Sequence, residues 1–206
     1  AELPAAQNVA ALAPGLGLER ITYISGATAF EENRWFPLTA QKLAAEEAIR
    51  ACGVPFTLFC PTWPMEMLPR LARGGPPLIV GDSPLPTHWF AADDMARMIS
   101  GAYQRQDAAN RKRFVHGPEA LTMVEALTRY CRAFHPDVES VAQMPVEAAR
   151  TTAAATGNQM LGFFTELMAY FAKVGEMGDP SEANELLGAP ATRLDAWIEE
   201  RQAQCA

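Results

Sequence analysis

Two largely apolar segments separated by a helix-forming segment most constrain the fold of this chain. ITYIS at 21–25 and VPFTLFC at 54–60 are apolar through their length rather than alternating, which favours strands covered on both faces of a parallel sheet. Between them, LTAQKLAAEEAIRA at 38–51 is rich in strong helix formers, and Gly53 follows where helices commonly end. A strand, a helix and a strand at this spacing form a right-handed β-α-β unit. The sequence therefore predicts an α/β fold with a parallel sheet.

Further helices and shorter strands are expected along the rest of the chain. Residues 4–18 predict a helix that runs into the PGLGL segment, with Leu3, Val9, Ala10 and Leu12 on its buried side. Thr122 and Glu125 have the spacing of a capping box, so a helix is expected to begin there. Other helices are expected at 90–103, at 159–171, which is apolar nearly all round, and from 192 onward, with strands at 76–82, 113–117 and 138–144.

The composition limits the classes of partner and location. The 206 residues are 49% apolar with a formal net charge of -7, which suits one compact core and argues against nucleic acid or an anionic membrane surface as partner. The only basic cluster, RKR at 111–113, is interpreted as a solvated turn. No apolar run reaches about 18 residues, so no membrane span is expected. The first residues lack the order of a signal peptide, and the four cysteines lack metal-binding spacing, which together favour a cytoplasmic location.

Two loops at the carboxyl ends of the predicted strands are the first candidates for a site. In open α/β sheets, ligands bind outside the carboxyl ends of the strands. SGATAFEENRWF follows the first strand and PTWPMEM follows the second, so the two loops are expected to approach each other. Their large apolar side chains either line a pocket or cover the core under the carboxy-terminal helices, and both interpretations stay open. These side chains are Trp35, Phe36, Trp63, Met65 and Met67.

Few polar residues in these segments carry a chemical signal. Ser25 ends the first strand and Lys42 lies early in the next helix, so a hydroxyl and an ammonium group can converge on a ligand's hydroxyls; a turn-forming serine and a solvated lysine are the alternative. Ser25 is not in a G-x-S-x-G elbow, which disfavours a hydrolase. The three histidines are far apart in sequence, so no metal site is predicted; His88, in PTHWF, is the one beside an expected pocket wall.

The order of several motifs resembles one family. ITYISG, then K-x-x-x-E at Lys42 and Glu46, then GVPFTLFCPTWPMEML, is similar to the NmrA-like branch of the atypical short-chain dehydrogenase/reductases. THWFAADDMARMI, RFVHGPEALTMVEAL and GAPATRLDAWIEE resemble later segments of that family in the same order. The resemblance covers most of residues 5–200. It implies the carboxy-terminal part of a Rossmann-like parallel sheet with flanking helices, at 1–120, interleaved with a small, mostly helical substrate region at 121–206.

The resemblance also implies roles for individual residues. Ser25 and Gly26 would border the nicotinamide of NADP or NAD, and Lys42 would hydrogen-bond its ribose, with Ser25 and Lys42 as the catalytic pair. Pro61, Thr62 and Trp63 would lie along the nicotinamide. The residues expected to face a substrate are Trp35, Phe36, Trp63, Met65 and His88.

Three departures from the family pattern qualify this expectation. The glycine fingerprint that places a pyrophosphate at a helix N-terminus is missing, since G-L-G at 15–17 follows a helix rather than a strand. Leu38 stands where the wider superfamily has a tyrosine that donates a proton, and Cys60 replaces an arginine. The chain is therefore expected to be a fragment that holds only the nicotinamide end of the cofactor. The bare edge of its first strand would be covered by dimerisation or rearrangement.

Three functions follow as expectations. The first is an oxidoreductase that moves hydride between NADPH and a small carbonyl or quinone. The second is a non-catalytic NAD(P) sensor that binds a protein partner, which Leu38 favours. The third is an isolated module that has lost nucleotide binding and acts through its exposed sheet edge. Fold alone does not choose among them.

Overall fold

The computed structural model of the protein describes residues 2–73 and 77–205. Contacts between residues divide the chain into two compact units, and the chain passes between them several times. Both units draw on each of the predicted ranges, 1–120 and 121–206. The first unit contains the chain up to Thr62, Ala92–His116 and Met177–Ala191, and the second contains Trp63–Ala91, Gly117–Glu176 and the chain from Thr192.

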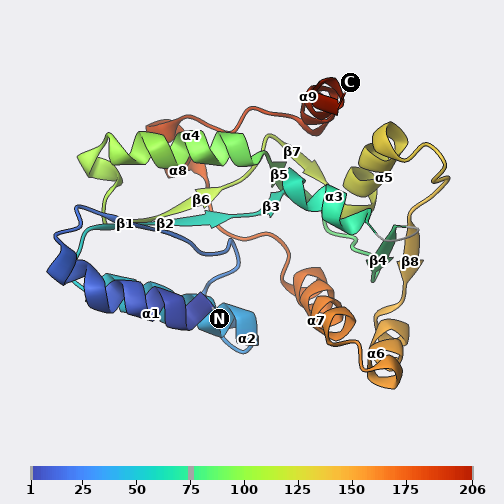
Figure 1. Ribbon diagram of the computed structural model, residues 1–206, viewed down its shortest axis with the longest axis horizontal. Coiled ribbons are helices and arrows are strands. Elements are labelled where there is room, and N and C mark those ends of the chain that lie inside the picture. Colours follow the sequence, from blue (N-terminus) through green and yellow to red (C-terminus); the bar gives the residue numbers. More distant parts are fainter. Residues whose placement is uncertain (1, 74–76, 206) are drawn as a thin grey trace. The chain divides into compact units, whose positions relative to one another are not determined.

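The first unit is built on a three-stranded parallel sheet in the order β1-β2-β6 (Figure 1). β1, Ile21–Ile24, pairs with β2, Phe56–Pro61, which pairs in turn with β6, Arg111–Val115. The first five residues of β2 are buried, as expected for a strand covered on both faces. The two predicted strands therefore lie side by side, in parallel, with β1 at the edge of the sheet.

Helices cover both faces of this sheet (Figure 1). α1, Glu2–Leu12, and α2, Pro37–Ala51, lie on one face, while α4, Ala92–Tyr103, and α8, Ser181–Leu187, lie on the other. The chain has the predicted α/β class, with parallel strands and flanking helices. The unit also contains the short 3-10 helices Ala13–Leu16, Glu31–Asn33 and Gln106–Ala108. One core cluster between α1, α2 and the sheet includes Ala13, Ile21, Ala45, Ile49, Val54, Phe56 and Leu58.

The first helix is shorter than predicted and buries only part of the predicted set of residues. The α-helix ends at Leu12 and continues only as a 3-10 turn, because Pro14 has no N–H for the helical ladder and disfavours helical torsions in the residue before it. Ala10 is buried as predicted, together with Ala6, and Leu3 packs against the core cluster, whereas Val9 is 47% and Leu12 is 64% exposed. The expectation that Val9 and Leu12 are buried is wrong, because small side chains form the contact face of this helix.

The basic cluster RKR is not a solvated turn, which corrects the sequence interpretation. Residues 111–113 begin β6 and pair with β2, so Arg113 points into the first unit and is 1% exposed. Its guanidinium donates to the main-chain oxygen of Asp107 at 3.0 Å and lies 2.5 Å from the Glu182 carboxylate on α8. A charge in this position is structural, since burial requires a paired and hydrogen-bonded partner.

The second unit contains two small sheets (Figure 1). β3, Trp63–Pro64, and β7, Glu119–Leu121, flank β5, Thr87–Phe90, and β7 runs antiparallel to β5. β4, Leu78–Val80, pairs in parallel with β8, Ala142–Met144. The strands predicted at 76–82, 113–117 and 138–144 correspond to β4, β6 and β8, although residue 76 lies outside the described residues. β5 and β7 are too short to show a period in the sequence.

The helices of the second unit include some that sequence analysis missed. The predicted capping box is present at the start of α5, Met123–Phe134, where the Glu125 N–H donates to Thr122 Oγ1 at 3.2 Å. α7, Gln159–Val174, keeps Met160 and Phe163 exposed, so it is covered on fewer sides than its composition suggests. One missed helix, α6, Val146–Thr156, consists largely of alanine and threonine. The single-turn helix α3, Leu68–Leu71, was not predicted either, and the others are α9, Leu194–Cys205, and the 3-10 helix Met65–Met67.

Within the described ranges 2–73 and 77–205, no helix has the length and apolar character needed to cross a membrane.

Candidate functional site

The carboxyl end of β1 brings together a lysine, a serine and an open glycine. Lys42 stands in the second turn of α2, and its ammonium donates to the main-chain oxygen of Ile24 at 3.0 Å. Ser25 directly follows β1, and a Cβ atom added at Gly26 would meet no atom within 4 Å. Three of the predicted site residues, Ser25, Gly26 and Lys42, therefore lie around one strand end.

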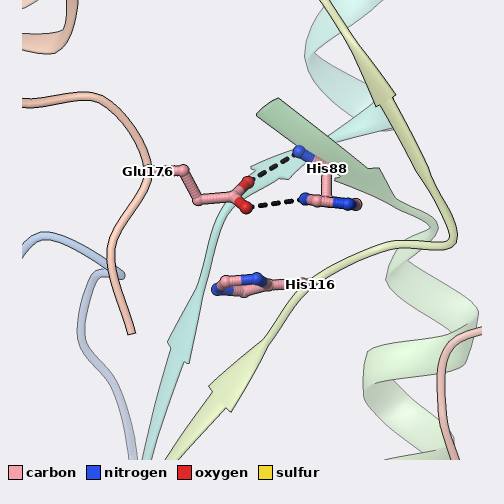
Figure 2. Close-up of side chains that lie close together, drawn as sticks. All are labelled: His88, His116 and Glu176. Atoms are coloured by element: carbon pink, nitrogen blue, oxygen red, sulfur yellow. Dashed lines mark hydrogen bonds and ion pairs between the residues drawn. The ribbon is translucent and has the colours of Figure 1, made fainter. Parts of the chain in front are cut away.

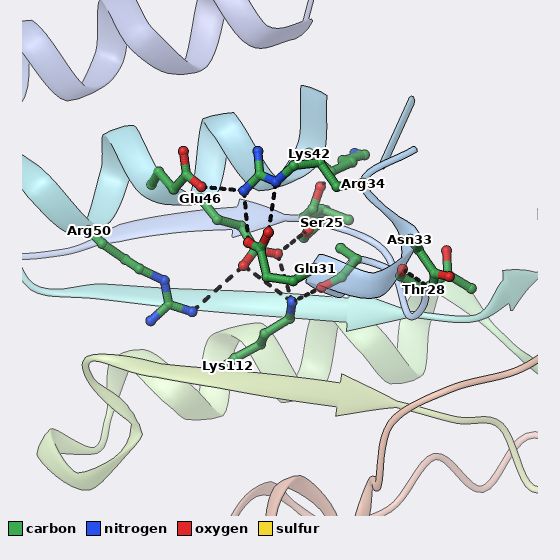
Figure 3. A network of polar contacts seen from close by, with 12 residues as sticks. Ser25, Thr28, Glu31, Asn33, Arg34, Lys42, Glu46, Arg50 and Lys112 are labelled. Carbon is green, nitrogen blue, oxygen red and sulfur yellow. Dashed lines mark hydrogen bonds and ion pairs between the residues drawn. The ribbon is translucent and has the colours of Figure 1, made fainter. Parts of the chain in front are cut away.

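A buried carboxylate ties this strand end to two cations. Glu46, one helical turn after Lys42, accepts a hydrogen bond from Ser25 Oγ at 2.5 Å (Figure 3). Lys112 Nζ, on β6, lies 3.0 Å from Glu46 Oε1, and Arg50 Nη2 lies 3.6 Å from Oε2. Only 5% of the Glu46 side chain is exposed, so these cations offset the cost of removing its charge from water. Lys112 also donates to the main-chain oxygen of Ala29 at 2.5 Å.

A second carboxylate, Glu2 on α1, reaches the same lysine. Glu2 forms an ion pair with Lys42 and accepts a hydrogen bond from the Tyr23 hydroxyl at 2.7 Å. Burial alone would raise the pKa of the Glu2 carboxyl, but the hydrogen bonds from Lys42 and Tyr23 bring it below its ordinary value. Burial and the bond to Glu2 raise the pKa of Tyr23 well above its usual range. A ligand that uses Lys42 therefore shares its ammonium with Glu2 or displaces Glu2.

The main-chain groups at the end of β2 are already paired. The Pro61 oxygen accepts from the Ala27 N–H at 3.1 Å, and the Thr62 N–H donates to the Val115 oxygen at 3.1 Å. These bonds hold the loop after β1 against the end of β2. Pro61 and Thr62, predicted to lie along a nicotinamide, offer a surface there rather than further main-chain hydrogen bonds.

The cysteine in this region is a core residue. Cys60 is fully buried on β2, and burial raises the pKa of its thiol to about 12. A thiol with so high a pKa is protonated and unreactive at neutral pH. Cys60 is therefore part of the packing beneath the strand ends and not a nucleophile.

An aromatic cluster surrounds Trp63 in the second unit. The Trp63 ring centroid lies 5.1 Å from that of Phe171 on α7 and 6.2 Å from that of the fully buried Trp89. Trp63 and Phe171 line a largely enclosed cavity of about 40 Å³, together with Leu85 and Met168. That volume admits a few water molecules and is far below the roughly 300 Å³ of a small-ligand pocket. A substrate beside Trp63 would require these side chains to move.

His88, on β5 of the same unit, pairs with the carboxylate of Glu176, which follows α7. Glu176 Oε1 is 2.6 Å from His88 Nδ1, and Glu176 Oε2 accepts the His88 main-chain N–H at 2.6 Å (Figure 2). The His88 side chain is 40% exposed, against 15% for Glu176. One carboxylate oxygen thus contacts the His88 imidazole, while the other holds the main chain of the same residue. Sequence analysis selected His88 but missed Glu176, which lies 88 residues away and follows α7 without any motif.

The other predicted substrate residues have different environments. Met65 is fully buried and does not line the Trp63 cavity, so it is core at this position. Trp35 is 55% exposed and packs edge to face against the buried Phe36, with ring centroids 6.1 Å apart. Trp35 and Phe36 belong to the first unit, whereas Trp63, Met65 and His88 belong to the second. Their convergence on one substrate stays a prediction.

The residues at the end of β1 fit one end of a nicotinamide nucleotide. An ammonium group anchored to a strand end suits the hydroxyls of a ribose, and the open space at Gly26 leaves room for a ring beside them. The glycines near α1 do not fit the phosphates of the same nucleotide. Within the part of the chain that the structure describes, Gly15 and Gly17 lie in and just after the 3-10 turn behind α1, with no strand leading into them. They do not form the strand-to-helix turn that cradles a pyrophosphate.

Comparison with known proteins finds solved structures with a similar fold. No protein-family model and no curated protein matches the chain. Among solved structures, triphenylmethane reductase of Citrobacter sp. complexed with NADP(H) is similar with a TM-score of 0.70 at 18% identity, covering 96% of this chain and 70% of that one. An NADPH-dependent quinone oxidoreductase from Escherichia coli complexed with NADPH gives 0.72 at 17% identity, with 97% and 71% covered.

A nucleoside-diphosphate-sugar epimerase from Staphylococcus aureus is similar to the same degree. Its TM-score is 0.73 at 15% identity, covering 96% of this chain and 70% of that one. Identities this low establish the fold and not the chemistry. The chain therefore has a Rossmann-like α/β fold, and its activity must be argued from its own residues.

Proposed function

We propose that this protein is an NAD(P)H-dependent oxidoreductase of the NmrA-like type that reduces a small carbonyl or quinone. The observation that carries the proposal is the Lys42 ammonium held at the carboxyl end of β1, beside Ser25 and the open space at Gly26. The similarity of the fold to NADPH-dependent reductases supports the same assignment.

Each residue at this strand end has a role in the proposal. Bound NADPH supplies the hydride. Lys42 binds the hydroxyls of the nicotinamide ribose, in place of or beside Glu2. Pro61 and Thr62 form the surface along the nicotinamide, and their own hydrogen bonds hold that surface rigid. Rigid placement of the cofactor is the main source of catalysis in such a site.

The substrate in this proposal lies against Trp63. An aromatic wall suits flat, apolar acceptors such as quinones because stacked rings bury apolar area with a defined geometry. The cavity beside Trp63 is too small for such a molecule as it stands. Leu85, which lines it and is 44% exposed, is the side chain whose movement would enlarge it with least disturbance of the core.

Oxidation of NADPH in the presence of a quinone panel tests the proposal. The protein is expected to oxidise NADPH only when an acceptor is present, and Lys42→Met is expected to raise the KM for NADPH at least about tenfold, since one charge-assisted hydrogen bond is worth roughly 1.5–3 kcal/mol. Glu32→Gln, an exposed change in the same unit, serves as the control. Absence of turnover with every acceptor would contradict the proposal.

One observation favours a non-catalytic NAD(P) sensor as the second candidate. Leu38 occupies the position where the wider superfamily carries its proton-donating tyrosine. A sensor would bind NADPH saturably yet give no turnover with any acceptor, and it would bind a protein partner. Saturable binding with no turnover in the assay above would therefore select this function.

We further propose association through the outer edge of β1. β1 is the last strand of its sheet in the described part of the chain, and Ile24 on it is 48% exposed. An apolar edge strand is a template for pairing with another chain. Sedimentation velocity over a hundredfold concentration range should show a dimer of wild type, and Ile24→Lys should shift it to monomer. A monomer at every concentration would contradict this association.

A further inference from the structure

The hydroxyl of Ser25 is held in one direction by the buried network around Glu46 (Figure 3). Ser25 is 5% exposed, and its Oγ donates to Glu46 Oε1 at 2.5 Å. Glu46 is itself 4% exposed. Both partners of this hydrogen bond are thus removed from bulk water, so water does not readily compete for the serine hydrogen.

The neighbours of Glu46 keep it in the role of acceptor. Lys112 lies within 3.0 Å of Oε1 and 3.2 Å of Oε2, and Arg50 lies 3.6 Å from Oε2. A carboxylate that faces two cations only accepts hydrogen bonds. A serine has a single hydroxyl hydrogen, and Glu46 takes it. The lone pairs of Ser25 Oγ are therefore what remains for other groups, and the buried Cys60 thiol is one such neighbour within hydrogen-bond reach.

The main-chain N–H groups of Ser25 and Ala27 are already hydrogen-bonded, so a ligand would not find them open. The Ser25 N–H donates to the Phe59 oxygen at 2.7 Å, and the Ala27 N–H donates to the Pro61 oxygen at 3.1 Å. Beside them, Gly26 opens onto free space. A ligand donor that reaches Ser25 Oγ at this strand end would meet an acceptor.

We infer that Glu46 positions Ser25 as a hydrogen-bond acceptor and thereby selects ligands that present an N–H donor at the end of β1. Resting on the proposed function, the donor is the carboxamide of the nicotinamide. Glu46 is a positioning residue that acts through Ser25, and Lys112 holds Glu46 in that role. Ser25 then binds the cofactor and does not donate a proton to a substrate oxygen, which differs from the catalytic role that the family resemblance implies.

A pair of nucleotides tests this inference directly. NADPH carries the carboxamide, whereas the reduced 3-acetylpyridine analogue carries a methyl ketone that keeps the carbonyl and lacks the N–H. Fluorescence titrations of the two ligands into the full chain give the ratio of their Kd values. Wild type should prefer NADPH by about fivefold to tenfold, the worth of one net hydrogen bond.

Variants then assign that preference to the network. Ser25→Ala should bring the ratio close to one. Because Glu46 changed alone would leave Lys112 buried without its partner, the double variant Glu46→Met/Lys112→Met is used, which replaces the ion pair with apolar side chains of similar size. It frees the serine hydroxyl to donate as well as accept, so the ratio should fall below that of wild type. Glu47→Gln, whose exposed carboxylate pairs with Arg34, should leave the ratio unchanged.

The outcomes separate this inference from the proposed function. A wild-type ratio near one, with both ligands bound, would overturn the inference and leave the proposed function standing. A preference for NADPH that survives in Ser25→Ala would overturn it as well, because the discrimination would then arise elsewhere. If neither ligand binds, the proposed function fails and this inference fails with it.

Discussion

Different interactions hold the side chains in two regions of the molecule. Polar contacts do so at the end of β1 in the first unit, and apolar packing does so around Trp63 in the second unit. Around Ser25, a buried carboxylate and two cations fix the side chains through short, directed polar contacts. Around Trp63, three aromatic rings and their apolar neighbours fill space with almost no cavity left. The polar contacts fix the orientation of side chains around Ser25, and the aromatic packing sets the shape of the space beside Trp63.

The two regions should respond very differently to loss of one partner. Lys112→Met removes a cation and leaves Glu46 buried with only the more distant Arg50. We expect a loss of about 3–5 kcal/mol in the free energy of unfolding, as for other broken buried ion pairs. Urea denaturation followed by circular dichroism measures the change.

The matched double variant tests whether the lost stability comes from the unpaired charge of Glu46. Glu46→Met/Lys112→Met should regain most of the lost stability, because no unpaired charge remains. If Lys112→Met alone were as stable as wild type, the polar region would not depend on this ion pair.

The aromatic region should lose less stability when a ring is removed. Phe171→Ala deletes the ring that lies 5.1 Å from Trp63, and we expect a loss of about 1–3 kcal/mol because Phe171 is only half-buried. Phe163→Ala, on the same helix and 52% exposed, should change stability by no more than about 0.5 kcal/mol. Equal losses in the two variants would show that the rings around Trp63 add nothing beyond ordinary helix packing.

The contact between α1 and Lys42 should depend on pH. Hydrogen bonds from Lys42 and Tyr23 lower the pKa of Glu2 below its ordinary value of 4.5. A carboxyl group with a lowered pKa in the folded state stabilises the protein above the unfolded value and loses that contribution as pH falls through the folded value. Stability should therefore decline below about pH 4.5, and by a smaller amount in Glu2→Gln. Identical pH profiles of wild type and variant between pH 7 and pH 3 would remove Glu2 from this role.

Thiol labelling gives the smallest and most local test of the polar region. With a pKa near 12, about one Cys60 in ten thousand is a thiolate at pH 8, and the residue is fully buried. Iodoacetamide followed by peptide mass analysis should modify the partly exposed Cys52 far faster than Cys60. Comparable rates would mean that the strand ends open to solvent.

Regular periodic segments were predictable from the sequence, and irregular ones were not. The first β-α-β unit followed from two apolar runs and one helix-forming run, and the capping box at Thr122 followed from local spacing. β5, β7 and α6 were missed because short strands show no period and an alanine–threonine helix has no apolar stripe. RKR was misread because burial of Arg113 depends on Glu182, 69 residues further along the chain, which no local pattern reveals.

The candidate site was predictable only in part, for a similar reason. Ser25, Gly26 and Lys42 flank one β-α junction, so strand and helix geometry alone brought them together. Some partners of the predicted side chains come from distant parts of the sequence. Lys112 lies on another strand, and Glu176 lies in a loop far from His88 in sequence. The positions of side chains could be anticipated, whereas their hydrogen-bond partners required the three-dimensional structure.

The most direct test of the central claim compares how this 206-residue chain binds NADPH and reduced nicotinamide mononucleotide, by calorimetry. The account places every contact at the nicotinamide–ribose end of the ligand. It predicts that the two ligands bind with Kd values within about tenfold of each other, and that Lys42→Met weakens both equally. Binding of NADPH that is a hundredfold tighter and insensitive to Lys42→Met would contradict the account, because the adenosine phosphates would then carry the affinity.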